Sequence, residues 1–378
     1  MRAAVACAGL CFVVTGASHA AEWLIAPSMR VATVYTDNPR LLEEGGTSSA
    51  GAIADLSARL QRRTERLDLE LQPRWYSARA RDDETLNTDD QYLDARINYL
   101  TERSQWSGSM GFARDTTLTS EAGSTGLIQS NRRHESITVS GGPTWMLTER
   151  VDFSMQGYVL DSHYVDPGNT GLVDYQYRLA SLGGGVAATE RSTVRLTLQG
   201  GELVVPDFDT RTRDGSARLA WEFKSGGLWT TTLSAGPAYV DAEFGHDTGP
   251  VFDVDAERRG ERWTFAAHAG RGLTPTGRGV LTKRDRAVLS FNRQFTQNVS
   301  AGTTLQWIRN QNLQQQPGIA FDDVDYLRVD LNLNWRLGEH WSFALSMGGA
   351  SQSYDNQNDA GSYRASVGIV WNGQQRSL

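Results

Sequence analysis

Cysteine is almost absent from this sequence. The 378 residues contain two cysteines, Cys7 and Cys11, and both lie within the first 20 residues. Residues 21–378 therefore carry no thiol, which excludes a disulfide framework and a cysteine-ligated metal from that part of the chain.

The first 20 residues have the composition of a secretory signal peptide. Arg2 supplies the positive start, a short apolar run follows from Ala3 to Val14, and small residues lead to a cleavage site after Ala20. We therefore expect residues 1–20 to direct export and to be removed.

Long hydrophobic runs are also missing. Only 39% of the residues are hydrophobic, and no stretch after residue 20 approaches the roughly 18 apolar residues of a spanning helix. The net charge of −7 argues against a nucleic-acid partner, because such partners are bound by basic surfaces. An exported chain without a hydrophobic helix is either soluble or a transmembrane β-barrel.

Apolar and polar residues alternate along most of the chain. Leu67, Leu69 and Leu71 alternate with acidic and amide residues, and residues 327–337 repeat the pattern with Leu, Val and Trp. This period places apolar side chains on one face of a strand and polar ones on the other. The longer runs last about 9 to 11 residues, the length of a tilted strand that crosses a bilayer, whereas strands of soluble sheets average about 5–6. The pattern predicts an all-β fold, a transmembrane antiparallel β-barrel.

The tripeptide Thr-Glu-Arg punctuates this alternation. It begins at Thr64, Thr101, Thr148 and Thr189, each time between two alternating stretches, as expected for the tight turn of a hairpin. Four other short polar segments continue the spacing, and longer polar connections such as 120–132 and 245–250 separate the turns. The eight hairpins and the two chain ends predict about 18 strands in a barrel over residues 21–378, with short periplasmic turns. The weakest strand expected is 251–259.

Tryptophan gathers near the expected tight turns. Trp rings favour the boundary between membrane and water, because one edge is apolar and the other donates a hydrogen bond. We expect seven of them to form a membrane-interface belt: Trp106, Trp145, Trp221, Trp263, Trp335, Trp341 and Trp371.

The polar strand faces should line a lumen. In lipid every backbone N–H and C=O must pair, so the barrel has to close on itself, and about 18 strands enclose more space than side chains fill. The charges facing inward either pair across strands or select what passes. We expect pairing to account for most of them and a few to touch cargo. The candidate cargo contacts are Arg59, Arg74, Arg96, Tyr158, Arg195, Arg218, Arg328, Arg336 and Arg364.

Catalytic and metal-binding patterns are lacking. Five histidines follow the signal peptide, and none has a carboxylate or serine partner that spacing alone identifies, because triads are recognised by geometry. We therefore expect no enzymatic activity, no catalytic residue, no metal and no cofactor. The run Gly183-Gly184-Gly185 precedes no helix and indicates a bend or close approach within a strand.

Two stretches resemble a known family. PSMRVATVYTDN, from Pro27 to Asn38, is similar to the opening strand of a β-barrel porin family whose genes accompany exopolysaccharide export. GLTPTGRGVLTKRD, from Gly272 to Asp285, resembles a loop-and-strand segment of its exosortase-associated branch. Pro39 departs from the family, which has an aliphatic residue there. The resemblance implies an outer-membrane conduit with a secreted polysaccharide as cargo and a periplasmic polysaccharide export protein as partner.

The sequence thus places the chain in the outer membrane, in contact with membrane lipid, and leaves three functions open. The first is polysaccharide export, and the alternative is a general diffusion or solute-uptake porin. A structural or adhesive barrel with a plugged lumen is the third. The longest connections are only about a dozen residues, which is typical of surface loops, so we expect an open lumen.

Overall fold

The structure is a computed structural model that describes residues 23–122, 131–226, 228–243, 245–313, 323–354 and 359–377. The expected signal peptide, residues 1–20, lies outside the described residues.

Eighteen strands of 13 to 16 residues make up about three quarters of the described chain. They form where the alternation of apolar and polar residues is continuous, because each strand then offers one face to lipid and one to water. Their bounds are β1 Trp23–Thr36, β2 Ser49–Arg63, β3 Leu67–Ala80, β4 Thr88–Leu100, β5 Ser104–Thr116, β6 Arg133–Met146, β7 Val151–Val165, β8 Tyr175–Thr189, β9 Ser192–Val205, β10 Thr210–Ser225, β11 Trp229–Ala242, β12 Gly245–Arg259, β13 Trp263–Pro275, β14 Leu281–Gln294, β15 Val299–Asn312, β16 Val324–Arg336, β17 Trp341–Tyr354 and β18 Ala360–Asn372.

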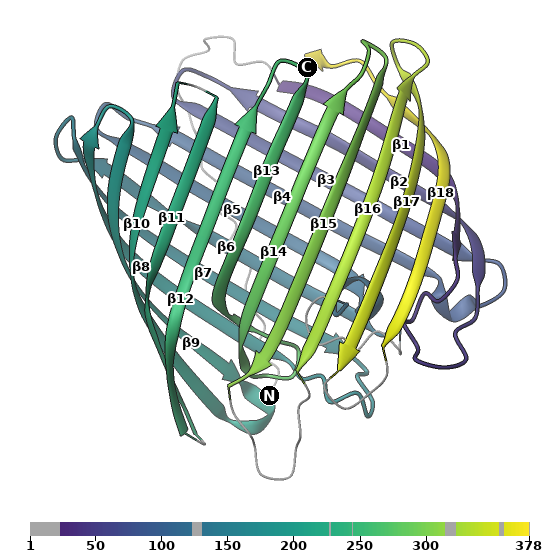
Figure 1. Cartoon of the computed structure of the whole chain (residues 1–378), viewed down its shortest axis with the longest axis horizontal. Helices are drawn as coiled ribbons and strands as arrows, with labels where there is room; N and C mark the ends of the chain where they lie inside the picture. Colours follow the sequence, from purple (N-terminus) through teal and green to yellow (C-terminus); the bar gives the residue numbers. More distant parts are fainter. Residues whose placement is uncertain are drawn as a thin grey trace.

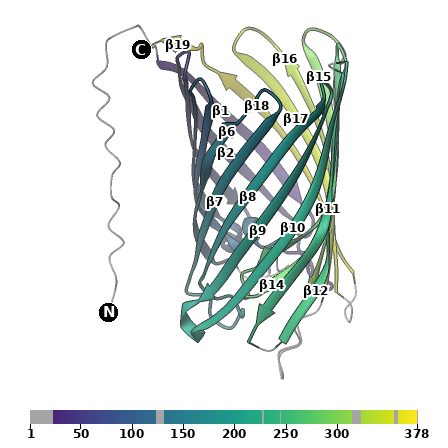
Figure 2. The same ribbon diagram turned by 90° about the vertical axis from the view of Figure 1, so that its left-hand side faces the viewer.

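The strands close into one antiparallel barrel. Each strand pairs with its neighbours in chain order, and β1 pairs with β18 from Ser28↔Asn372 to Thr36↔Arg364. A two-residue strand, β19 (Arg376–Ser377), extends this closure along the start of β1. Figure 1 shows the result as a cylinder of tilted strands, and Figure 2 shows the wall around β7 to β10. The predicted fold and strand number are confirmed.

Large apolar side chains cover the outside of the cylinder. Leu196 and Leu198 are each 51% exposed, and Ile369 is 50% exposed. Outward apolar side chains with fully paired strands are what a bilayer requires of a spanning sheet. In the described part of the chain, no helix is both long and apolar enough to span a membrane.

The repeated tripeptide has a specific role in the tight turns. The Thr64 hydroxyl accepts hydrogen bonds from the backbone N–H groups of Arg66 (3.3 Å) and Leu67 (3.0 Å). Thr148 repeats both bonds within its own turn, to Arg150 and Val151. Threonine thus fixes the turn, as Ser and Thr do in short side-chain turns. These turns share one end of the barrel with Trp23 and Asn372, and their shortness identifies that end as periplasmic.

One predicted connection is wrong. Residues 245–250 were expected to be a loop, but they form the first part of β12 and pair with β11 from Ala242↔Gly245 onward. Gly, His and Pro disfavour strands on average, and here the register of β11 overrides that preference. The connection between β11 and β12 is therefore only residues 243–244.

The wall contains one seam. On its other side β12 pairs with β13 only from Phe252↔Arg271 to Arg259↔Thr264, so the ladder stops before the long-loop end. The tip of the β13–β14 hairpin continues without β12, and Lys283 Nζ reaches across to Asp247 Oδ2 at 2.7 Å. We call this break, between residues 245–251 and 272–275, the seam.

Candidate functional site in the barrel lumen

The nine predicted cargo contacts lie on the inner face of the wall. Each alternates with outward apolar residues of its own strand, as Arg328 does with exposed Leu327 and Val329. Five of the arginines are ion-paired to acids on the same strand, on the adjacent strand or on the next strand but one, in agreement with the expectation that pairing dominates. The pairs are Arg59–Glu70 (3.6 Å), Arg74–Asp55 (2.7 Å), Arg195–Asp152 (2.7 Å), Arg218–Asp253 (3.0 Å) and Arg328–Asp330 (2.6 Å).

The other four candidates differ from these. Tyr158 packs against an apolar cluster, with its ring edge-on to Tyr177 at 6.2 Å between centroids. Arg96, Arg336 and Arg364 make no ion pair within 4.0 Å to any described residue. Contact of any of the nine with cargo stays a prediction.

A segment between β5 and β6 folds into the lumen. It contains α1 (Thr117–Ser120) and continues through Glu121 and Ala122. Thr117 is fully buried. Its backbone N–H donates to the Arg132 carbonyl and its hydroxyl accepts from the Arg132 N–H, so the two ends of the connection are brought together. We call residues 117–122 the inward segment.

The inward segment touches opposite walls of the barrel. Glu121 accepts a hydrogen bond from the Tyr164 hydroxyl on β7, while Leu118 and Ala122 pack against an apolar cluster formed by Leu41, Ile308, Tyr326 and Ala360. In the closed order of 18 strands, β7 and β16, the strand of Tyr326, are nine strands apart in either direction, so they face each other across the lumen. The segment therefore lies in the lumen between β7 and a cluster that belongs to the opposite side of the barrel.

A second contact narrows the same end. The N–H of Val173, in the β7–β8 connection, donates to the carbonyl of Gly277 in the β13–β14 connection at 2.8 Å. Leu172, Leu203, Val205 and Leu281 are each less than 4% exposed in the cluster beneath this contact. Since β8 and β14 are six strands apart, the two connections meet over the lumen, not within the wall.

The interpretation of the long connections as ordinary surface loops is therefore wrong for this end of the barrel. The three connections 37–48, 117–132 and 166–174 supply Leu41, the inward segment and Leu172 to the interior. Their length is ordinary, and what turns them inward is apolar side chains that meet partners on distant strands. The spacing of residues along the sequence does not indicate which distant residues these side chains will contact.

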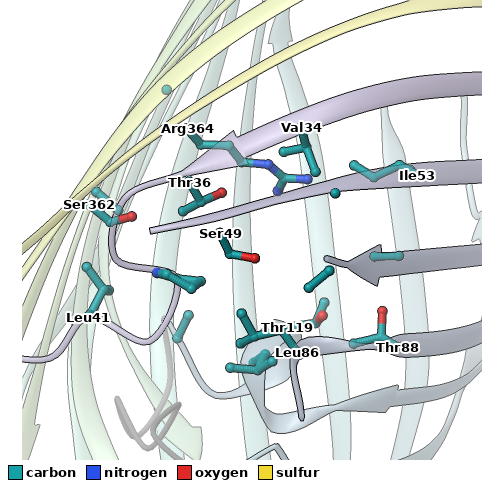
Figure 3. Close-up of a pocket in the computed structure, with 18 of the residues that line it drawn as sticks. Val34, Thr36, Leu41, Ser49, Ile53, Leu86, Thr88, Thr119, Ser362 and Arg364 are labelled. Atoms are coloured by element: carbon teal, nitrogen blue, oxygen red, sulfur yellow. The ribbon is translucent and has the colours of Figure 1, made fainter. Parts of the chain in front are cut away.

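A pocket remains beside the inward segment. It has a volume of about 320 Å³ and lies between the inward segment and the continuous stretch of wall formed by β16, β17, β18, β1, β2 and β3. In Figure 3 the Arg364 side chain extends from β18 into this space above Thr36 and Ser49, while Thr119 and Leu86 lie below. We call it the lumen pocket.

The lumen pocket combines charged, hydroxyl and apolar groups. Arg328 holds both carboxylate oxygens of Asp330, at 2.6 and 3.0 Å, so these two charges compensate each other. Among the described residues, the hydrogen-bond partner of Arg364 is the Tyr76 hydroxyl, to which it donates at 3.5 Å. Such a mixture of an apolar lining with a few placed polar groups is typical of sites for small molecules.

A buried triad of side chains lies in the wall near the inward segment. His134 Nδ1 is 2.9 Å from Asp115 Oδ1, and His134 Nε2 is 2.9 Å from Ser162 Oγ. This is the connectivity of a serine hydrolase triad, which sequence spacing did not identify. Ser162 is only 1% exposed and His134 8%, so the hydroxyl does not face open space. The arrangement ties β5, β6 and β7 together beneath the inward segment.

The seven predicted belt tryptophans lie on the outer face near the tight turns. Trp106 meets Trp145 edge-on at 6.2 Å between ring centroids, and Trp341 pairs in register with Trp371. Three more of them also lie close to the tight-turn end of their own strands: Trp263, Trp221 and Trp335. Their role as a membrane-interface belt stays a prediction.

Comparison with known proteins gives similarity of form only. No family model matches the chain, and no curated protein matches it. Among solved structures, the outer membrane protein OpdK of Pseudomonas aeruginosa is 11% identical, with a TM-score of 0.46 and coverage of 92% of this chain and 99% of that one. OccK9 (OpdG) of the same organism is 12% identical at TM-score 0.49, with 93% and 98% covered. OccK2 (OpdF) in complex with glucuronate is 11% identical at 0.49, with the same coverage. At these values the similarities decide nothing about the solute of this chain.

The backbone closure, the apolar exterior and the short turns lead to one conclusion. The chain is an 18-stranded outer-membrane β-barrel with a polar lumen that is narrowed at its long-loop end.

Proposed function

We propose that the barrel is a channel through which small hydrated solutes enter across the outer membrane. The observation that carries this proposal is the inward segment, which lies between Tyr164 on one side of the lumen and the apolar cluster of Leu41, Ile308, Tyr326 and Ala360 on the other. A channel obstructed in this way suits a compact solute better than a long polysaccharide chain.

The character of the wall supports passage of polar solutes. Ion pairs such as Arg74–Asp55 and Arg195–Asp152 face the lumen and balance one another, so the wall is hydrated without a strong field of one sign. A solute with many hydroxyl groups exchanges hydrogen bonds with such a wall at little cost.

Polysaccharide export is the second candidate, and the resemblance to export-associated barrels favours it. The two resembling stretches contribute to the narrowed end: Asn38 donates to the carbonyl of Leu42 beside inward-facing Leu41, and Leu281 belongs to the apolar cluster. In this function the cargo is a polysaccharide, a periplasmic export protein is the partner, and the inward segment withdraws during transport.

The width of the channel distinguishes a solute channel from a polymer conduit. Swelling of proteoliposomes should be measured with a series of neutral polyols and oligosaccharides of rising size. We expect the wild type to admit polyols of monosaccharide size and to exclude longer oligosaccharides. Replacement of residues 118–122 by Gly and Ser should admit the longer ones. Equal entry of all sizes through both proteins would contradict the proposal.

Deletion of the gene addresses the cellular role. Reduced uptake of small polyols with normal surface polysaccharide supports the solute channel. Loss of surface polysaccharide with unchanged polyol permeability would overturn it and favour export.

A further inference from the structure

We propose that the lumen pocket binds the carboxylate of a small organic anion whose body carries hydroxyl groups, with Arg364 as the residue that recognises the charge. This inference rests on the proposed solute channel and names the class of solute that its pocket selects.

Arg364 combines an unpaired charge with a place in the lumen pocket. Five of the candidate arginines have an acid within 4.0 Å, whereas Arg364, like Arg96 and Arg336, has none among the described residues, and of these three only Arg364 lines the pocket. Asp330, the acid that lines the same pocket, is held at both oxygens by Arg328. The pocket therefore has one positive charge that no protein carboxylate neutralises.

Neighbouring side chains hold the surroundings of that charge in place. Asp55 accepts two hydrogen bonds from Arg74, at 2.9 and 2.7 Å. The Arg74 guanidinium lies over the Tyr76 ring, 5.7 Å from its centroid, and the Tyr76 hydroxyl is the contact of Arg364. A guanidinium with free N–H groups beside a fixed hydroxyl matches a carboxylate, which accepts two parallel hydrogen bonds.

The other residues that line the pocket indicate the polarity and size of the rest of the solute. Thr36, Ser49 and Ser362 place hydroxyl groups near Arg364, as Figure 3 shows, and Ile53 and Leu118 add apolar surface. The volume of about 320 Å³ is at the lower end of the roughly 300–1,000 Å³ found for ligand pockets. A short hydroxylated monocarboxylate fits this combination of charge, polarity and size.

Gluconate and sorbitol are suitable probes, because they share a six-carbon polyol chain and differ mainly by the carboxylate. The reversal potential of barrels in planar bilayers, under a potassium gluconate gradient, gives the permeability of gluconate relative to potassium. Sorbitol-driven swelling of proteoliposomes reports the open channel independently of charge. The variant is Arg364→Gln, and the control is Arg150→Gln, which removes the same charge from an exposed tight turn.

We expect Arg364→Gln to lower the gluconate-to-potassium permeability ratio by about threefold to tenfold, the range for loss of one partly screened charge contact. Sorbitol entry should be unchanged, and Arg150→Gln should leave both values unchanged. An unaltered gluconate ratio in Arg364→Gln, with normal sorbitol entry, would overturn the inference and leave the solute channel intact. If the wild type admits neither gluconate nor sorbitol, the proposed function as a solute channel is wrong, and this inference is wrong as well.

Discussion

The Tyr164 hydroxyl donates a hydrogen bond to Glu121 Oε1, and this contact fastens the inward segment to β7. Both side chains are only 3% exposed. A hydrogen bond to a buried carboxylate contributes about 1.5–3 kcal/mol, so this contact is strong enough to hold a short segment across an aqueous lumen.

Removal of that donor should release the segment. Tyr164→Phe keeps the ring in the apolar cluster and deletes only the hydroxyl, so we expect the inward segment to leave the lumen part of the time. Single-channel recordings should then show larger and more frequent conductance steps than the wild type. Tyr35→Phe is the matched control, because Tyr35 lies on the outer face and is 51% exposed. Identical conductance in Tyr164→Phe would show that the segment is held by other contacts.

The wall of the barrel was predictable because its signals are local. Alternation along residues 67–75 fixes which face of β3 meets lipid, and each Thr in the repeated tripeptide caps its turn within three residues. These features depend on near neighbours, so a single sequence displays them.

The interior was not predictable for the opposite reason. Leu118 meets the apolar cluster that contains Tyr326, and Val173 meets Gly277, only after the barrel has closed. Likewise, residues 245–250 form a strand because they pair with β11, although their composition favours a loop. The arginines were assigned to the lumen from alternation, but nothing in the spacing distinguishes paired Arg328 from unpaired Arg364.

The seam should depend on Lys283. Its ammonium group bridges to Asp247 where the β12–β13 ladder has ended, and both side chains are partly exposed, so the pair contributes about 1 kcal/mol or less. Lys283→Met should speed amide hydrogen exchange on residues 245–251 by up to about fivefold, with little change on β16, which is paired continuously with β15 and β17. Arg271→Met is the control, because its partner Asp285 lies on the paired neighbour β14. Equal exchange at the seam in wild type and Lys283→Met would mean that side-chain packing alone holds it.

The buried triad should behave as a structural link. Because Ser162 is 1% exposed, we expect a fluorophosphonate probe to leave the folded barrel unlabelled. His134→Ala removes the partner of both Asp115 and Ser162 and should lower the free energy of unfolding by about 1–3 kcal/mol. Urea unfolding in detergent micelles measures that loss. Labelling that disappears in Ser162→Ala would contradict this assignment and indicate an accessible nucleophile.

Two Gly-Pro pairs create close backbone approaches in the wall. In β6 the register with β7 is interrupted at Gly142-Pro143, and in β11 the register with β10 is interrupted at Gly236-Pro237. Proline has no N–H for the ladder, so the facing strand is left without that hydrogen bond. At both places the facing backbone moves in over the glycine: a Cβ on Gly236 would lie 1.8 Å from the Ala217 carbonyl oxygen, and one on Gly142 would lie 1.9 Å from that of Met155.

Alanine at either glycine should therefore destabilise the barrel. The added methyl group meets backbone, which cannot move without breaking further ladder bonds, so we expect Gly142→Ala and Gly236→Ala each to cost about 1–3 kcal/mol. Gly184→Ala is the control, because a Cβ there meets no atom within 4 Å. The measurement is the fraction of refolded protein that migrates as a compact band in unboiled gel samples, followed against urea. If both variants unfold at the same urea concentration as the wild type, the facing strands can move apart at no cost. The close approach would then not constrain the fold.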